Sequence, residues 1–470
     1  MKDTKENLGV DSQGIQKTMK GYQFLGDGMA QFALNSMSGL VGMITYFYTD
    51  KVEISAAATG TILLISKIID AITDLIMGRI VDKTKSKYGK ARPWLLWMSI
   101  PAVIALVLLF CVPSKTDSGI KIAYGLATNI FLSAIVYTAI AIPYGCLISL
   151  TTKSTEERSK MGIIRAVMGY ISGMIIAIGL IPITNALGGD QRAWILVSAI
   201  FGVLSAGSLI WAFAVSKERY SDELNGEDKK NSDSDVSFKD SLVILFKNKY
   251  WIIMLFVMLF VNIIYSLSSS TGVYYTKYIL GNENLVALLG GVGLIPVIIG
   301  FAVTQPMVKR FGLARSARIA MLIGIFGTIV RIIEPYNLYV TLIFGSLVTF
   351  ATIPLMAVGG VLVNNTIEYN EWKFGKRLVG MSNSASSFGA KIGSGLGSAM
   401  IGWILALGHY DGTLAVQEAS AINSIIAICI WIPGIFLVLI YLLLRRYDLD
   451  NKYAEIVREL ETRRKISIQE

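Results

Sequence analysis

The stretch DAITDLIMGRIVDKTKSKYGKARP, residues 70–93, decides the fold of this chain. Its first half belongs to an apolar run, 54–81, that is long enough to cross a bilayer, because a helical span needs roughly 20 apolar residues. Asp70 and Asp74 lie one helical turn apart, so their side chains point the same way, with Thr73 close beside them. A carboxylate at the centre of a membrane helix costs about 2.5–3.5 kcal/mol on insertion scales, so the pair predicts a functional site.

These side chains predict a cluster of oxygen ligands in a nearly dry place. Such a cluster suits a hard monovalent cation or an exchangeable proton. The structural alternative is an internal ion pair, because Lys67 lies three residues before Asp70 on nearly the same helical face. The two acids alone leave both interpretations open.

The composition is that of a membrane protein that crosses the bilayer many times. Of the 470 residues, 53% are hydrophobic and 16% are charged, whereas an ordinary soluble domain carries about 25% charged residues. The net charge of +10 does not indicate a nucleic-acid partner, because the basic residues lie in short loops between apolar runs. The three cysteines and the single histidine have no metal-ligand spacing, so buried thiols and a loop histidine are expected.

Polar breaks divide the chain into twelve predicted spans. Net-basic loops, including 82–92, 153–165 and 309–318, all fall on the side of the amino terminus. The positive-inside rule therefore places both termini in the cytoplasm of a multi-pass protein of the cell membrane. The predicted spans are 27–49, 54–81, 94–112, 121–150, 162–187, 193–215, 251–280, 284–308, 315–335, 338–364, 378–408 and 417–444.

The spans form two halves of six. The first half is 1–215, a hydrophilic cytoplasmic linker is 216–250, the second half is 251–445, and a cytoplasmic tail is 446–470. The basic turn VDKTKSKYGKARP after the second span has a degenerate echo, VKRFGLARSAR, after the eighth. This organisation predicts an all-α membrane protein with the major facilitator superfamily fold. The tail is expected to form an amphipathic helix that docks on the cytoplasmic surface.

Polar residues also interrupt the fourth span. Tyr137, Ala141 and Tyr144 form one stripe at helical spacing, with Thr138 beside it. These side chains either line a cavity or only support helix packing next to the kink that Pro143 introduces.

Two further basic residues lie in predicted spans. Lys391 lies deep in the small-residue run SNSASSFGAKIGSGLGS of the eleventh span, where a lysine needs a carboxylate partner or a water-filled cavity. The second and eleventh spans meet in this fold class, so Lys391 is expected near Asp70 and Asp74. Arg165 is either an interfacial arginine or a donor to sugar hydroxyls or a substrate carboxylate.

The sequence lacks the motifs of an enzyme. A single histidine, the absence of a Walker-type loop and the absence of an HExxH motif exclude the common hydrolytic and ATP-driven mechanisms. A gradient-driven carrier remains. A sugar sensor is disfavoured because the linker and the tail are too short to hold a signalling domain.

Four stretches resemble one family of carriers. DAITDLIMGRIVDKTKSKYGKARPWLL, YFYTDKVEISAAATGT, IPYG followed by ERSKMGIIR, and NNTIEYNEWKFGKR resemble the glycoside–pentoside–hexuronide:cation symporters, and the similarity runs from residue 21 to 464. The resemblance implies alternating access in a major facilitator fold, with a cation site and a sugar site that share a cavity. It implies no cofactor besides a coupling ion, and a functional monomer in a lipid bilayer.

The resemblance also implies roles for particular residues. The cation site of the melibiose-type members corresponds to Asp70, Thr73, Asp74 and Thr138, and threonine at position 73 replaces the asparagine that is common there. Na⁺ or H⁺ coupling stays open, with Li⁺ as a further option. Lys67 stands where the family commonly has arginine and is expected to balance charge. The implied substrate-binding residues are Tyr137, Arg165, Ser386, Ser387 and Lys391.

The chain departs from the melibiose-type members at the sugar-binding acids. The fourth-helix aspartate corresponds to Ala141, and the first-helix aspartate corresponds to Leu34 or Gln31 by two ways of counting, with Asn35 nearby. Gly145 replaces a tryptophan. These departures argue against an α-galactoside. Because Arg165 and Lys391 are retained while cavity acids are missing, a glucuronide-like anionic sugar is favoured. The alternatives are a neutral pentoside or xyloside carried with H⁺, or a non-sugar anion or lysolipid.

Overall fold

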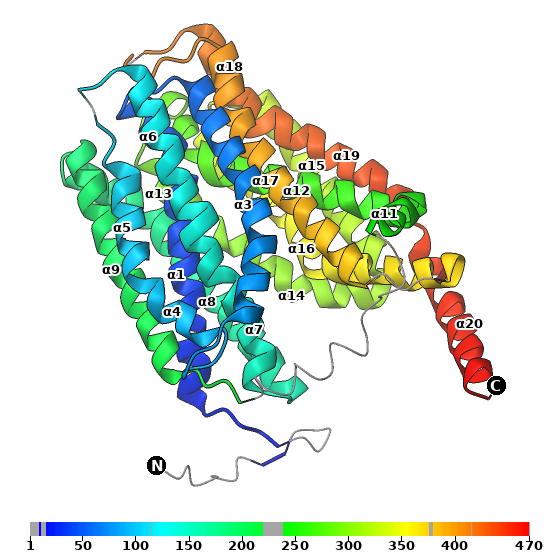
Figure 1. The fold of residues 1–470 in the computed structure, drawn as a ribbon. Helices are drawn as coiled ribbons and strands as arrows, with labels where there is room; N and C mark the ends of the chain where they lie inside the picture. The colour runs from blue at the N-terminus through cyan, green and yellow to red at the C-terminus, as the bar shows by residue number, and fades with distance from the viewer. Residues whose placement is uncertain are drawn as a thin grey trace. The chain divides into compact units, whose positions relative to one another are not determined.

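The structure is a computed structural model that describes residues 9–10, 16–113, 115–219, 238–375, 379–414 and 416–469. The chain divides into two compact units, Met1–Ser232 and Asp233–Glu470. Every regular element named in this part of the chain is a helix (Figure 1).

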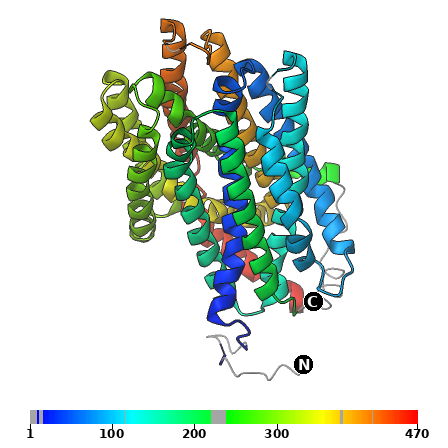
Figure 2. The same ribbon diagram turned by 90° about the vertical axis from the view of Figure 1, so that its left-hand side faces the viewer.

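The first unit consists of six helical stretches, of which three are broken into shorter elements. Helix α1 runs alongside α8 and α9, while α3 packs along α6, η1 and α7 (Figures 1 and 2). The π-helical segment η1 continues directly into α7, so the fourth stretch has a wide turn in its middle. The elements are α1 (Gly21–Gly42), α2 (Ile44–Asp50), α3 (Ala56–Lys83), α4 (Arg92–Trp97), α5 (Ser99–Phe110), α6 (Ser118–Ile130), η1 (Phe131–Tyr137), α7 (Thr138–Thr151), α8 (Thr155–Ala186) and α9 (Gln191–Val215).

The second unit pairs α12 with α17, and α15 with α16 and α19. A π-helical segment again interrupts its last membrane stretch, between α18 and α19. The elements are α11 (Phe238–Lys247), α12 (Lys249–Tyr278), α13 (Leu285–Val292), α14 (Leu294–Phe311), α15 (Leu313–Ile333), α16 (Leu338–Phe374), α17 (Val379–Leu407), α18 (Ala419–Ile426), η2 (Ala427–Trp431), α19 (Ile432–Arg445) and α20 (Leu449–Gln469).

Helix α11 lies inside the stretch 216–250 that the sequence analysis treats as a linker. Its sequence FKDSLVILFK has apolar residues at helical spacing, and Leu245 is buried against Trp251 at the start of α12. The end of the predicted linker is therefore a packed helix. Residues 220–237 lie outside the described part of the chain.

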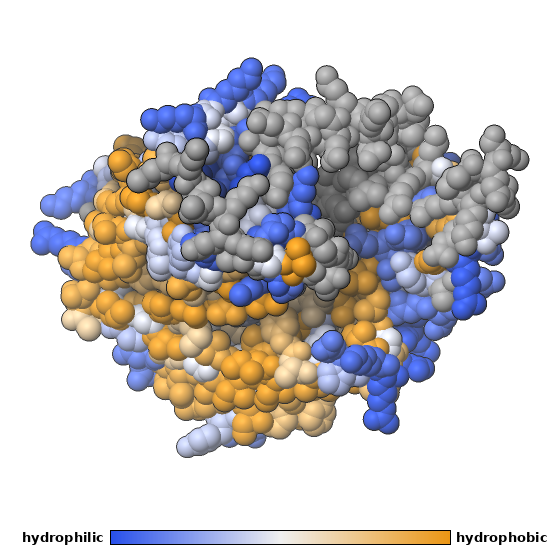
Figure 3. All heavy atoms as spheres, turned by 90° about the horizontal axis from the view of Figure 1, so that it is seen from below, coloured by the Kyte–Doolittle hydropathy of each residue, from blue (hydrophilic) through white to orange (hydrophobic). Residues whose placement is uncertain are grey.

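Nine helical stretches in the described residues are long and apolar enough to cross a membrane. The three other predicted spans fall on α1–α2, α3 and α4–α5, which are helical but shorter or more polar. Large apolar side chains are exposed on many helices, and Figure 3 shows hydrophobic residues over broad areas of one face. Soluble proteins rarely expose such areas, so these surfaces suit contact with lipid. Examples are Ile100, Ile200, Ile298, Ile333 and Ile343.

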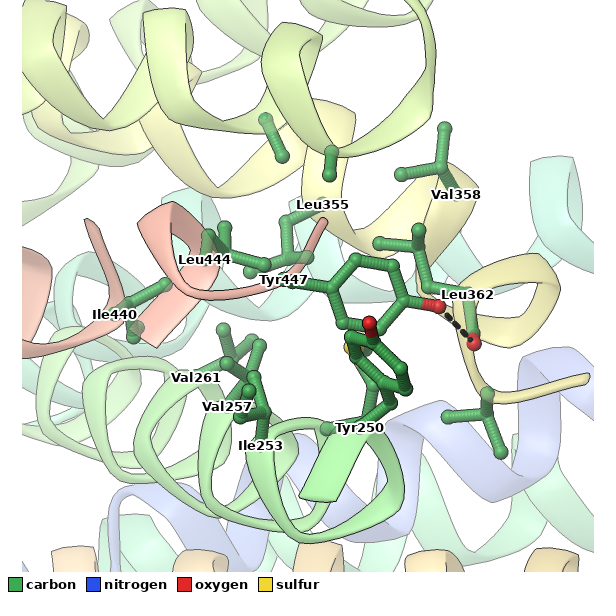
Figure 4. Close-up of a cluster of buried hydrophobic side chains, with 14 of the residues drawn as sticks. Tyr250, Ile253, Val257, Val261, Leu355, Val358, Leu362, Ile440, Leu444 and Tyr447 are labelled. Atoms are coloured by element: carbon green, nitrogen blue, oxygen red, sulfur yellow. Dashed lines mark hydrogen bonds between the residues drawn. The ribbon is translucent and has the colours of Figure 1, made fainter. Parts of the chain in front are cut away.

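The tail helix α20 belongs to the core of the second unit. It contributes buried side chains to a cluster that includes Tyr250 and Tyr447, whose rings meet edge-on with centroids 5.5 Å apart (Figure 4). The Tyr447 hydroxyl donates to the Leu362 carbonyl at 2.8 Å, and the Tyr250 hydroxyl donates to Asp448 at 2.7 Å. The buried tail residues in this cluster are Leu449, Ile456 and Leu460.

Glycines allow α17 to pack closely on α12. A Cβ atom at Gly393 would collide with the backbone of Leu259, and one at Gly397 would lie 2.9 Å from the Ile263 carbonyl oxygen. The Ser266 and Ser398 hydroxyls hydrogen-bond across the same interface at 2.9 Å. The small residues of the eleventh predicted span are therefore explained by this contact.

We expect Gly393→Val to destabilise the second unit, because a branched side chain at this position must push the two helices apart. Overpacking typically costs about 1–3 kcal/mol. Thermal unfolding of the purified protein in detergent should occur at a lower temperature. Gly360→Ala is the control, because a Cβ at Gly360 meets no atom within 4 Å. A similar unfolding temperature for both variants would contradict the packing argument.

Candidate functional site

The two carboxylates of the second span meet the hydroxyl of Thr138. The Thr138 Oγ1 atom lies 2.9 Å from Asp70 Oδ1 and 2.9 Å from Asp74 Oδ1. Asp70 and Thr138 are each 2% exposed, while Asp74 is partly exposed. A hydroxyl has one proton and can donate to only one carboxylate at a time. The Thr138 hydroxyl and the two carboxylates therefore form one group of oxygen atoms between α3 and α7. We call this group the oxygen cluster.

The π-helical segment η1 adds a backbone oxygen to this place. Thr138 Oγ1 lies 3.3 Å from the carbonyl oxygen of Ser133, five residues earlier in the chain. Single-turn π segments occur frequently at functional sites because they widen the helix. Ser133 was not predicted from the sequence, because it contributes its backbone carbonyl oxygen and no residue pattern indicates the π-helical turn.

Thr73 and Lys67 take different positions around Asp70. The Thr73 hydroxyl donates to the Asp70 backbone carbonyl at 3.0 Å, so its hydrogen is directed along the helix and not to the carboxylates. Lys67 Nζ lies 3.4 Å from Asp70 Oδ2, and its side chain is 27% exposed. The ammonium group offsets one of the two negative charges, in line with the ion pair and the charge balance considered for Lys67 from the sequence.

A second polar cluster joins α1, α7 and α8. Arg165 donates from Nε to Asp27 Oδ2 at 2.7 Å and from Nη2 to Asp27 Oδ1 at 2.8 Å. Its Nη1 donates to the Tyr144 carbonyl at 3.1 Å, and its guanidinium carbon lies 3.6 Å from the centre of the Tyr144 ring. The Tyr144 hydroxyl donates to the Asp27 carbonyl at 2.9 Å. We call Asp27, Tyr144 and Arg165 the three-helix cluster.

All three members of this cluster are buried, with exposures of 2% for Asp27, 3% for Tyr144 and 8% for Arg165. A two-pronged arginine–carboxylate pair is among the stronger polar interactions in proteins. The structure therefore gives Arg165 an internal carboxylate partner that sequence reasoning did not assign. The sequence did contain a signal for this partner. Asp27, in the motif GDG, lies one helical turn before Gln31, at the start of the first predicted span.

Polar side chains continue along α1 beyond Asp27. Gln31 Nε2 donates to Asn35 Oδ1 at 2.7 Å, and Asn35 Nδ2 donates to the Gly169 carbonyl of α8 at 3.0 Å. Asp27, Gln31 and Asn35 recur every four residues, so they share the face of α1 that packs on α8. Gln31 and Asn35 are both partly exposed.

The remaining predicted residues are distributed over both units. Tyr137 and Ala141 are partly exposed on η1 and α7 of the first unit. Lys391 is partly exposed and Ser387 is exposed on α17 of the second unit. The side chain of Ser386 lies outside the described residues. The expected proximity of Lys391 to Asp70 stays a prediction.

Known proteins similar to this chain are sugar carriers and symporters. The family model described as MFS/sugar transport protein matches residues 26–451. The uncharacterized symporter YnaJ of Bacillus subtilis (strain 168) is 31% identical over 450 residues, covering 94% of this chain and 95% of YnaJ. The isoprimeverose transporter of Lactiplantibacillus pentosus is 31% identical over 447 residues, covering 92% and 90%. A solved D-xylose-proton symporter shares the fold, with a TM-score of 0.65 at 13% identity over 92% of this chain and 98% of that chain.

The chain belongs to the MFS/sugar transport protein family. The predicted major facilitator fold and the predicted membership of the glycoside–pentoside–hexuronide:cation symporters are confirmed. The chain is a multi-pass membrane transporter that carries a sugar or glycoside together with a cation, and it is not an enzyme.

Breaking the Asp27–Arg165 pair should destabilise the first unit. Asp27→Asn leaves the buried guanidinium without its counter-charge, and loss of one partner of a buried pair costs about 3–5 kcal/mol. We expect a clear fall in the thermal unfolding temperature. Glu156→Gln is the matched control. It removes an ion pair of 2.8 Å between Lys17 and Glu156, whose side chains are 28% and 56% exposed, respectively. Exposed pairs contribute at most about 1 kcal/mol. If Asp27→Asn and Glu156→Gln lowered the unfolding temperature by the same small amount, the stabilising role of the Asp27–Arg165 pair would be contradicted.

Proposed function

We propose that the chain is a Na⁺-coupled symporter of an uncharged glycoside, with its coupling ion at the oxygen cluster. The observation that carries this proposal is the single Thr138 hydroxyl within 2.9 Å of both Asp70 and Asp74. The ion's ligands would be one oxygen from each carboxylate, the Thr138 hydroxyl and the Ser133 carbonyl. Oxygen ligands of this kind suit hard cations.

The charge balance supports one monovalent cation. Asp70 and Asp74 contribute two negative charges, and Lys67 offsets one of them at 3.4 Å. One Na⁺ adds a further positive charge beside the two carboxylates and so reduces the repulsion between them. A proton can satisfy the same balance and is the competing coupling ion.

Coupling follows from the same balance. Without the ion, the like charges of Asp70 and Asp74, which both lie within 2.9 Å of the Thr138 hydroxyl, repel each other at the contact between α3 and α7. Ion binding removes this repulsion and favours the sugar-binding arrangement. By linkage, the sugar raises the affinity for the ion by the same factor. Alternating access then carries both substrates across the membrane.

An uncharged glycoside fits the first unit better than the anionic sugar favoured from the sequence. That expectation relied on the positive charges of Arg165 and Lys391, but Asp27 engages Arg165 through two hydrogen bonds. Gln31 and Asn35 offer partly exposed amides, which are suited to sugar hydroxyls. A relative that is an isoprimeverose transporter supports the same class, since isoprimeverose is an uncharged disaccharide that contains xylose. Both termini are proposed to face the cytoplasm, on the charges of the loops.

Calorimetric titration of the purified protein tests the coupling ion. We expect Asp74→Asn to abolish the tightening of sugar binding by Na⁺, because the neutral amide removes the charge that the ion must balance. Asp117→Asn, an exposed loop carboxylate, is the control and should bind like the wild type. Na⁺ stimulation that persists in Asp74→Asn would contradict the site. A wild type that responds to pH but not to Na⁺ would identify a proton as the coupling ion.

The same titration tests the substrate class. Isoprimeverose or methyl-xyloside should bind more tightly than methyl-glucuronide in saturating Na⁺, because Arg165 is already neutralised. A clear preference for the glucuronide would contradict the uncharged-substrate proposal and leave the coupling-ion site untouched.

A further inference from the structure

We propose that the three-helix cluster is the mechanical link between the coupling ion and the sugar. This inference rests on the proposed function and adds a positioning role for Tyr144. In it, occupancy of the oxygen cluster changes the position of α7, and Tyr144 passes that change to α1 and α8. The resulting change in α1 and α8 alters the positions of the Gln31 and Asn35 amides.

The first step in the argument is that both clusters share one short helix. Thr138 is the first residue of α7, and Tyr144 follows six residues later, about 9 Å along the axis at 1.5 Å per residue. Thr138 also lies where the π-helical segment becomes an α-helix. A change in how Thr138 contacts Asp70 and Asp74 therefore acts on the same short helix that carries Tyr144, with Pro143 directly before the tyrosine.

The second step is that Tyr144 is attached to both neighbouring helices. Its hydroxyl donates to the Asp27 carbonyl of α1 at 2.9 Å, and its own carbonyl accepts from Arg165 of α8 at 3.1 Å. Its ring lies 3.6 Å from the Arg165 guanidinium carbon. These contacts are buried, where polar interactions are strong and costly to break. Helix α7 cannot shift at this level without moving α1 and α8 or breaking the contacts.

The third step connects Asp27 to the candidate sugar-binding residues. Gln31 and Asn35 follow on the same face of α1, which is continuous from Gly21 to Gly42. Asn35 is in turn hydrogen-bonded to Gly169, one turn beyond Arg165 on α8. A displacement at Asp27 or Arg165 therefore changes the geometry of the two amides.

A purely structural role for the cluster has a different consequence. Such a role makes its variants less stable but leaves unchanged the factor by which Na⁺ tightens sugar binding. That factor, the sugar Kd without Na⁺ divided by the sugar Kd with saturating Na⁺, separates the two roles. Coupling factors between sites are typically about 5–150-fold.

Tyr144→Phe is the principal test on the full-length purified protein, with isoprimeverose as the sugar probe. It removes the hydroxyl bond to Asp27 and keeps the ring against Arg165. We expect the sugar Kd without Na⁺ to change little and the coupling factor to fall to near 1. Linkage requires the effect of the sugar on Na⁺ affinity to fall equally, which is an independent readout.

The control is Tyr124→Phe. The Tyr124 hydroxyl of α6 donates to the Leu108 carbonyl of α5 at 3.0 Å, so this variant loses the same kind of interhelical bond in the same unit. Its coupling factor should equal that of the wild type. An equal loss of coupling in Tyr124→Phe would overturn the assignment to the three-helix cluster.

Arg165→Lys is the second test and decides the matter if Tyr144→Phe does not fold. Lysine keeps the charge pair with Asp27 but lacks the planar fork that also reaches the Tyr144 carbonyl. We expect a folded protein with a reduced coupling factor. If Tyr144→Phe and Arg165→Lys both keep the coupling factor of the wild type, the proposed link is wrong, but the proposed function still stands. A wild type whose sugar affinity responds to neither Na⁺ nor pH would overturn the proposed function as well.

Discussion

The structure of the first unit depends on one hydroxyl that lies between two carboxylates. Thr138 brings α7 against α3 at the level of Asp70 and Asp74, and a single proton cannot satisfy both acids. Electrostatic repulsion between like charges in a low-dielectric place is strong, so this arrangement is stable only when the charge is balanced. Lys67 provides part of that balance. In the proposed function, the coupling ion adds to it, and the contact between the two helices responds to the ion.

The buried pair of Asp27 and Arg165 differs from the oxygen cluster because its two charges are opposite. Asp27 and Arg165 neutralise each other completely, and their remaining hydrogen-bonding atoms reach backbone or aromatic groups of adjacent helices. The oxygen cluster brings two like charges together, whereas Asp27 and Arg165 form a pair of opposite charges that holds helices together. This contrast makes the two clusters suited to different purposes, although their α7 members Thr138 and Tyr144 are only six residues, or about 1.7 turns, apart.

The members of the oxygen cluster were predicted from two kinds of signal. Asp70 and Asp74 were identified from their spacing within one helix. Thr138, which lies 68 and 64 residues from them, was identified from a stripe in another span and a family resemblance. Asp27 was missed because its partner Arg165 lies 138 residues away, and no local pattern reports such a contact. The same holds for Ser133, whose contribution is a carbonyl in a π turn. Helix α11 was not predicted because it directly follows a hydrophilic stretch and was assigned to the same linker despite its apolar residues at helical spacing.

The burial of the last helix has a consequence for biosynthesis. Leu449, Ile456 and Leu460 belong to the same core as Tyr250, which begins the second unit. The first unit, by contrast, contains all of its own core within Met1–Ser232. During translation the first unit can assemble while the remaining chain is still being made, since domains generally fold as units in order of synthesis. The second unit cannot complete its core until α20 has been synthesised, because Leu449, Ile456 and Leu460 are part of that core.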